Sequence, residues 1–293
     1  MADPAKLEVE PAGSDPVTVE YCPTKRGYAV FEIPLEDCRA FHTIGLPLAP
    51  HVHPFVQAFD VARRDASADR GRRAFTEILE RYYASVRPTS ACDVVGLGAA
   101  DAPGLRDVPP IGYLYPWSEL GVAEIIARRK RSLKYVGMRY GVSPGDDAGH
   151  TFFGPVQAAR VELQVTRLHA LLEAVRRDGF KPFARDFPTK VVALRKAGRN
   201  RWLVEEGQHR FALGGALGTA AIPSIVTSVI RREDAPYWPQ VVAGIFTEAG
   251  ALALFDRLYD GVPAPIARDW STAAATPVEP LTSGADRGRR RRR

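Results

Sequence analysis

Residues 201–226 read RWLVEEGQHRFALGGALGTAAIPSIV, and this stretch decides the fold that the sequence predicts. A short apolar run ends at Glu205 and Glu206, and a small-residue segment with helical spacing extends from Gly207 to Gly218. A run rich in β-branched residues begins at Ile222. The pattern predicts a strand, a glycine turn, a short helix and a second strand.

The turn at Gly207 is the first candidate site. A glycine turn that opens a helix gathers free backbone N–H groups and the positive end of the helix dipole at one point, which favours a bound phosphate. Gln208, His209 and Arg210 add polar and cationic side chains there, and a planar guanidinium suits phosphate oxygens. His209 is open to two interpretations, a structural residue between buried strands or a phosphate contact.

The composition is that of a folded protein with one large domain or two modest ones. The chain has 293 residues, of which 45% are hydrophobic and 25% are charged. It lacks a long apolar run and an apolar segment near its first residue, so we expect no membrane span and a cytoplasmic location. Cys22, Cys38 and Cys92 are odd in number and far apart, which favours reduced thiols over disulfides or a zinc site.

The net charge of +6 lies in the last residues of the chain. Six arginines, Arg287 and those at 289–293, account for all of it, so the remainder is formally neutral. This composition predicts a disordered tail, with contact to RNA, DNA or an acidic membrane as the alternative.

Several other motifs are incomplete. No GxxxxGK[ST] sequence occurs, and GLGAADAPG from Gly96 has Asp101 where a dinucleotide-binding turn needs its third glycine. These gaps argue against a P-loop enzyme and a Rossmann fold. His51 and His53 form a His-x-His pair without an evident third ligand, which favours surface or helix-capping histidines over a metal site.

Periodicity outlines the remaining elements. Helical spacing predicts helices over 70–86, 119–140, 161–177 and 248–259, the last capped by Thr247. Strands are predicted over 28–35, 191–195 and 202–205, with a hairpin turn at Arg199 and Asn200, and Trp238 is expected to be buried. Cations crowd the second half of helix 119–140, either as a solvated face or as a surface for phosphate or nucleic acid.

Four pieces in order carry a family resemblance. They are RLHALLEAVRRDGFKP from Arg167, VVALRKAGRNRWLV from Val191, GQHRFALGGALG from Gly207 and IPSIV from Ile222. This order of helix, Gly-x-x-Pro, hairpin, GxHR turn, small-residue helix and Ile-Pro strand resembles the ParB/sulfiredoxin superfamily.

The resemblance implies an α+β fold with five segments. A ParB/sulfiredoxin-like core would span 91–235, after a disordered N-terminus at 1–20 and an N-terminal α/β extension at 21–90. A C-terminal helical cap would cover 236–271, before a disordered Arg-rich tail at 272–293.

The resemblance also implies a nucleotide phosphate held on the GxHR turn. The superfamily includes CTP-dependent DNA clamps, ATP-dependent sulfinic acid reductases, free-serine kinases and proteins labelled nucleases. The residues that would hold or approach the nucleotide are Gly207, Gln208, His209 and Arg210 in the turn, Gly179, Lys181 and Pro182 before the hairpin, and Arg167 on the preceding helix.

Departures from the family pattern select among these functions. Gln208 stands where sulfiredoxins have a cysteine, which argues against the reductase. The turn reads GQHR rather than the GERR of the DNA clamps, and no helix-turn-helix domain follows it. Generic nuclease activity lacks a metal cluster in the sequence. The leading hypothesis is an ATP- and Mg²⁺-dependent phosphotransferase that acts on a small hydroxylated molecule.

A kinase also needs a carboxylate to accept the hydroxyl proton. Glu162 and His209 are the catalytic candidates, with Glu205, Glu206 and Asp186 as further carboxylates. The rival hypothesis is a non-catalytic module that binds ATP, CTP or nucleic acid through residues 128–139 and the tail. The acceptor and the oligomeric state stay open.

Overall fold

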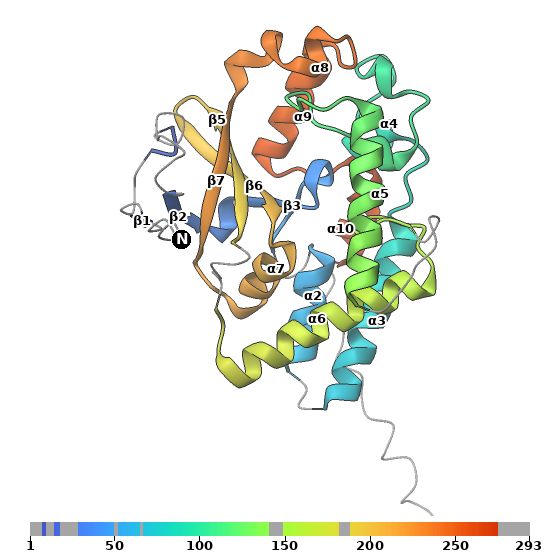
Figure 1. Ribbon diagram of the computed structural model, residues 1–293, viewed down its shortest axis with the longest axis vertical. Helices are drawn as coiled ribbons and strands as arrows, with labels where there is room; N and C mark the ends of the chain where they lie inside the picture. Colours follow the sequence, from blue (N-terminus) through green and yellow to red (C-terminus); the bar gives the residue numbers. More distant parts are fainter. Residues whose placement is uncertain are drawn as a thin grey trace, which may run out of the picture.

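The protein is a mixed α/β structure in which helices pack around a curled sheet (Figure 1). The computed structural model describes residues 8–9, 15–17, 29–49, 52–64, 67–140, 149–181 and 188–274. The strands follow the order β1-β2-β7-β5-β6-β3-β4 across the sheet. Their bounds are β1 Glu8–Val9, β2 Ala29–Pro34, β3 Cys38–Ala40, β4 Leu46–Pro47, β5 Lys190–Lys196, β6 Arg199–Glu206 and β7 Ala221–Arg231.

The centre of the sheet comes from the stretch that the sequence singles out. β5 pairs with β6 in an antiparallel hairpin and with β7 in parallel. The short helix α7, Gln208–Leu217, connects β6 to β7, as the glycine pattern predicts. The predicted hairpin turn at Arg199 was wrong by two residues, because the turn is made by Ala197 and Gly198, which both have positive φ angles of 49° and 74°.

The helices match the periodic segments closely. Their bounds are α2 Pro54–Arg63, α3 Ala68–Ser85, α4 Ala91–Val95, α5 Val122–Arg139, α6 Ala158–Asp178, α8 Pro239–Val242, α9 Glu248–Asp260 and α10 Arg268–Ala274. Thr247 caps α9 as predicted, since its hydroxyl accepts a hydrogen bond from the Gly250 N–H at 3.0 Å. Gly179 ends α6 with a φ of 77°.

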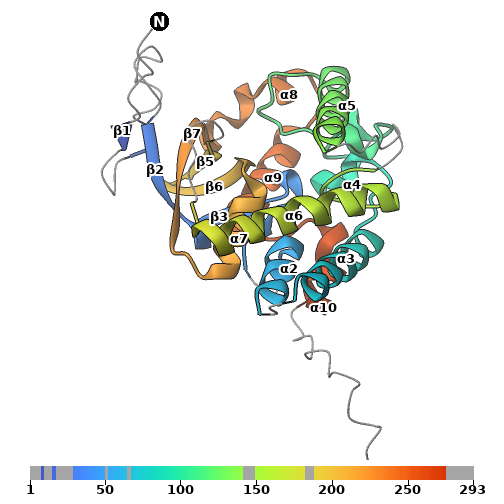
Figure 2. The same cartoon turned by 60° about the horizontal axis from the view of Figure 1, so that its bottom comes forward.

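The sheet crosses the boundary predicted at residue 91. β2 pairs antiparallel with β7, and β3 pairs in parallel with β6, so strands from the predicted N-terminal extension lie on both sides of the central strands β7, β5 and β6. α2 packs against α3 and α7, and α3 packs against α6 (Figure 2). The N-terminal segment is therefore built into the same sheet and helical layer as the predicted core.

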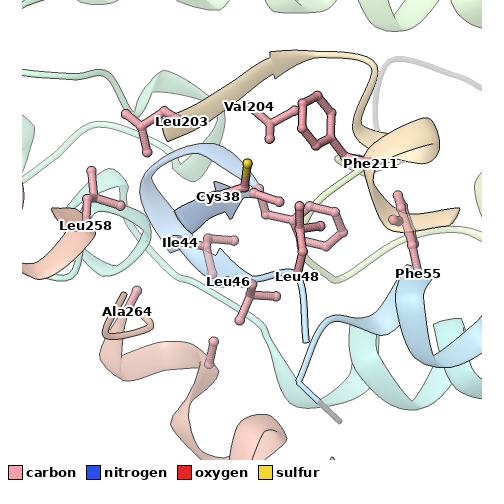
Figure 3. Packing of buried hydrophobic residues seen from close by; sticks show 14 of the residues in the cluster. Cys38, Ile44, Leu46, Leu48, Phe55, Leu203, Val204, Phe211, Leu258 and Ala264 are labelled. Atoms are coloured by element: carbon pink, nitrogen blue, oxygen red, sulfur yellow. The ribbon is translucent and has the colours of Figure 1, made fainter. Parts of the chain in front are cut away.

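A continuous apolar core joins these parts. Figure 3 shows residues of the N-terminal segment, such as Ile44 and Phe55, in the same cluster as Leu203, Val204 and Phe211 from β6 and α7. Trp238 is 5% exposed, as the sequence predicts. Cys38 and Cys92 are buried free thiols, whereas Cys22 lies outside the described residues.

One buried arginine ties distant segments together. Arg257 on α9 donates hydrogen bonds to the carbonyl oxygens of Thr43, Ile44, Val95 and Val262 at 2.5–3.3 Å. Within the described residues, no helix is long and apolar enough to cross a membrane.

Candidate functional site

The turn between β6 and α7 depends on Gly207. Its φ of 89° lies in the left-handed region, and a Cβ atom there would stand 2.6 Å from Cγ2 of Thr189. Any larger residue would therefore clash as well as strain the backbone. The glycine lets β6 turn directly into α7. The first N–H groups of the helix therefore lie at the C-terminal end of β6.

Gln208 has a structural contact on each side of its amide. Its Nε2 donates to the Val204 carbonyl at 2.6 Å, and its Oε1 accepts from the Phe41 N–H at 3.2 Å. The side chain is 8% exposed. Both ends of the amide are engaged with the backbone, so the structure gives Gln208 a positioning role for the turn rather than a free group for phosphate.

His209 and Arg210 lie where the helix begins. The His209 ring packs edge-on against Phe55, with centroids 5.1 Å apart. Burial lowers the pKa of His209 well below its usual value, and the charges of Arg167, His53 and Arg210 lower it further. His209 is therefore neutral at pH 7. Burial also lowers the pKa of the half-buried Arg210, while Glu206 opposes that effect.

A row of polar side chains on α6 reaches this turn at its Arg167 end, where the charge of Arg167 acts on His209. Arg160, Gln164 and Arg167 occupy positions i, i+4 and i+7, so they lie on one side of the helix. Arg160 is 3% exposed and Gln164 is fully buried. Nη1 of Arg167 donates to Oε1 of Gln164 at 3.4 Å.

Several donors in this row have no acceptor. They are Nε and Nη1 of Arg160, Nε2 of Gln164 and Nε of Arg167, all shielded from solvent. Buried polar groups are nearly always hydrogen-bonded, so a group of orphan donors indicates a missing acceptor. These three residues, together with His53, are called the donor cluster below.

His53 joins the cluster from the start of α2. Its Nδ1 accepts hydrogen bonds from the backbone N–H groups of Phe55 at 3.2 Å and Val56 at 3.4 Å, so it caps the helix. The predicted capping role is confirmed, and His51 lies outside the described residues. Since Nδ1 is an acceptor, the proton lies on Nε2, which is another buried donor without a partner. Burial lowers the pKa of His53 from 6.5 to about 3.

The donor cluster is electropositive. Burial lowers the pKa of Arg160, and the positive charge of Arg167 lowers it again, while Tyr83 opposes both effects. Burial also lowers the pKa of Arg167. Among the described groups that shift the pKa of Arg160, none is a carboxylate. The charge of Arg167 thus disfavours the buried Arg160 guanidinium, whereas Arg167 itself is supported by a hydrogen bond with the Tyr140 side chain. A bound anion would stabilise the Arg160 charge.

An aromatic and histidine-rich wall continues from the cluster. The His150 ring stacks on Phe153 with centroids 4.4 Å apart, and His42 lies 5.0 Å from the Phe152 ring. The charge of Arg160 acts on His150, which links this wall to the donor cluster. Burial and Arg129 lower the pKa of His42 to about 3.

The backbone at the foot of this wall is strained. Phe41 and His42 are consecutive non-glycine residues with φ angles of 58° and 54°. Such residues persist only where the surroundings hold them, and they often cluster at functional sites. The bond from the Phe41 N–H to Gln208 is one such restraint.

The structure does not bring every predicted site residue to this place. Glu162 forms an ion pair with Arg72, and its side chain is 56% exposed. It sits two residues after Arg160, or about 200° around the helix, and so lies on the opposite side of α6. Asp186 and Pro182 lie outside the described residues.

Gly179 and Lys181 also lie apart from the donor cluster. They follow the last turn of α6, whereas Arg160 lies in its first turn, about 28 Å away along the helix axis. The neighbouring Phe180 contacts the middle of α7, since a Cβ on Gly214 would lie 3.5 Å from its ring. Of the predicted nucleotide ligands, the structure brings together Arg167, His209, Arg210 and the Gly207 turn.

Two carboxylates end β6 just before the turn. Glu205 accepts a hydrogen bond from the Thr227 hydroxyl at 2.7 Å, and its charge raises the pKa of Tyr115 in the aromatic wall. Glu206 pairs with Lys190 at 3.0 Å. In the part of the chain that the structure describes, no group of three or more His, Cys, Asp or Glu side chains could hold a metal ion alone.

A separate hollow lies at the other end of α7. It is lined mainly by small and apolar residues, with Glu36 at its rim, and its lining includes Leu35, Leu48, Gly215 and Thr219. It lacks the buried cations and orphan donors of the cluster, so we place the candidate site at the start of α7.

Comparison with known proteins adds no family. No family model matches the chain, and neither the curated proteins nor the solved structures contain a match.

Sequence reasoning missed Arg160, Gln164 and the buried Nε2 donor of His53. The available signal was the polar row at i, i+4 and i+7 beside the apolar stripe of Val161, Val165, Leu168 and Leu172 on α6. Periodicity alone did not separate that row from the solvated side of the helix.

Proposed function

We propose that this chain binds the phosphate groups of a nucleotide at the donor cluster and the start of α7. The observation that carries the proposal is Arg160, a residue only 3% exposed whose Nε and Nη1 groups lack acceptors. An unpaired buried charge costs several kcal/mol, or about 3–5 kcal/mol when a partner is removed. Phosphate supplies the negative charge and the several oxygen acceptors that such a group needs.

Each part of the site has a distinct task in this proposal. Arg160 and Arg167 donate to phosphate oxygens from one side. The N–H groups at the start of α7 and the Arg210 guanidinium approach from the other side. Neutral His209 donates or accepts one hydrogen bond without adding charge. Gln208 holds the turn in place through its two backbone contacts.

We further propose that the core is ParB/sulfiredoxin-like and that the ligand is ATP with Mg²⁺, in the cytoplasm. The support is the orphan donors, which fit a polyphosphate, and the two carboxylates beside the turn. Mg²⁺ keeps several waters and takes one or two carboxylates plus phosphate oxygens, so Glu206 would hold it. Bound there, it would neutralise charge on the phosphates.

The reaction that we propose is phosphoryl transfer to a small hydroxylated molecule. Glu205 stands two residues before the Gly207 turn, and its charge acts on Tyr115, so we assign it as the carboxylate that accepts the proton of the attacking hydroxyl. Glu162 has no part in this version of the mechanism, because it lies on the opposite side of α6 and pairs with Arg72.

Calorimetric titration and nucleotide turnover test this proposal. ATP with Mg²⁺ should bind the wild-type chain, and Arg167→Met should weaken that binding at least tenfold. Arg177→Met is the matched control, because Arg177 lies on the same helix but is exposed and pairs with Asp178. Glu205→Gln should retain binding and lose turnover. Absence of binding by ATP, ADP, CTP and inorganic phosphate would refute the proposal.

A further inference from the structure

α5 leaves most of its surface in solvent. The helix packs against the Pro110–Gly112 turn, and Figure 2 shows it at the edge of the molecule. It carries six Lys and Arg residues and one carboxylate, Glu124. The inner side is fixed by Arg129, which donates to the carbonyl oxygens of Ile111 and Tyr113 and stacks over the Tyr113 ring at 3.4 Å.

The outer side combines cations with two large exposed side chains. Arg128, Arg131 and Lys134 are exposed, and Tyr135 and Met138 are each 65% exposed. We call these five residues the α5 basic face. Arg128, Arg131, Tyr135 and Met138 follow the spacing i, i+3, i+7 and i+10, which places them in one row along the helix.

We propose that the α5 basic face binds single-stranded nucleic acid. This face shares no residue with the donor cluster, although Arg167 of the cluster lies over the Tyr140 ring at the end of α5. It adds a second, polymeric ligand to the proposed function. The exposed cations match a phosphate backbone in charge. An exposed tyrosine ring beside them offers the stacking platform on which single-stranded binding relies.

Other anionic partners fit the face less well. A helix that lies on a membrane needs a continuous apolar side. On the α5 basic face, cations flank the large exposed apolar side chains of Tyr135 and Met138. An acidic peptide would be attracted by the cations but gives no reason for an exposed ring and thioether between them. The arrangement of alternating charge and aromatic surface favours bases and phosphates.

The dimensions set the expected strength. Residues 128–138 span about 15 Å along the helix axis. Phosphates of one strand follow each other at about 3.4 Å in a helical geometry, so the face covers about four of them. Each phosphate neutralised on a single strand contributes about 0.7 to the slope of log K against log salt. Removing three cations should therefore reduce that slope by about 2.

Fluorescence anisotropy with labelled 20-nucleotide oligothymidylate and oligouridylate tests the proposal on the full-length chain. The variant Arg128→Glu/Arg131→Glu/Lys134→Glu should lose affinity at least tenfold and show the smaller salt slope. Tyr135→Ala, which leaves the charge unchanged, should lose affinity about 5- to 150-fold, as expected for one stacked base. Calorimetry should show unchanged ATP binding for both variants, and Arg167→Met should leave oligonucleotide binding unchanged.

A matched triple variant separates a specific face from net charge. Arg73→Glu/Arg87→Glu/Arg106→Glu changes the net charge equally at exposed arginines elsewhere. If it weakens oligonucleotide binding as much as the α5 variant does, the proposal is overturned. A further variant replaces the six tail arginines by glutamine. If this variant alone loses all oligonucleotide binding, the contact lies in the tail and the proposal is overturned. Equal Tyr135-dependent binding to phosphatidylserine vesicles or polyglutamate would also overturn it.

Discussion

Arg160→Met should make the ligand-free protein more stable. The residue is 3% exposed and leaves Nε and Nη1 without acceptors, next to the like charge of Arg167. Each unsatisfied buried donor costs about 1–3 kcal/mol, and replacing buried charges with apolar groups of similar size often stabilises a protein by about 1–4 kcal/mol. Methionine matches the arginine stem and is flexible enough to fill the space.

We expect the free energy of unfolding to rise by about 1–3 kcal/mol. For a chain of this size each kcal/mol shifts Tm by about 2–4 °C, so Tm should increase by at least about 2 °C. In ATP at a hundred times its Kd, the wild type should gain about 2.7 kcal/mol, whereas the variant should gain none. Arg160→Met should thus have the higher free energy of unfolding without ATP, and ATP binding to the wild type should remove that difference.

Differential scanning calorimetry with and without ATP and Mg²⁺ provides the measurement. Arg177→Met is the control and should change neither Tm nor the ATP response. If Arg160→Met lowers Tm by several degrees, the guanidinium supports the fold, and the reasoning about a missing acceptor is refuted. Retained stabilisation of the variant by ATP would refute the ligand assignment.

Three further predictions concern the turn and its surroundings. Gln208→Leu should lower the free energy of unfolding by about 2–4 kcal/mol in urea titrations, because two backbone groups lose buried hydrogen bonds; a change near zero would contradict the positioning role. Gly207→Ala should cost more than 2 kcal/mol, roughly the strain of one residue in the left-handed region plus the clash; Thr189→Ser, which removes Cγ2, should recover part of it. His53 has a folded pKa of about 3 against 6.5 unfolded, so it contributes a slope of about 1.4 kcal/mol per pH unit to the fall in stability below pH 6.5, in addition to the contributions of His42 and His209. His53→Asn keeps a cap acceptor and should remove that slope between pH 6.5 and 5 in denaturant titrations; an unchanged slope would show that His53 does not titrate as described.

The sequence predicts local elements well because each is decided by neighbouring residues. The Gly207 turn, α7 and the Thr247 cap follow from glycine, small-residue and capping patterns that act within one or two turns. The hairpin turn was misplaced because Asn200 is a strong turn former, while Ala197 tolerates a positive φ only in its folded setting.

Long-range pairing could not be read from the chain in this way. β2 pairs with β7, and β3 pairs with β6, each across more than 150 residues of sequence. Neither β2 nor β3 has a residue pattern that identifies the strand with which it pairs. The site shows the same limit. Arg167 and His209 were predicted as site residues from the family motif. Arg160 becomes a candidate only in the folded structure, where it is buried without an acceptor. Glu162 looked suitable by residue type, and its position on α6 was the deciding fact.

A crystal structure grown with a non-hydrolysable ATP analogue and Mg²⁺ tests the central claim most directly. We expect phosphate oxygens about 2.7–3.2 Å from Arg160 and Arg167 nitrogens, with the N–H groups of Gln208 and His209 facing the same phosphates. A triphosphate bound elsewhere, with the Arg160 donors satisfied by a protein carboxylate or by water, would contradict it.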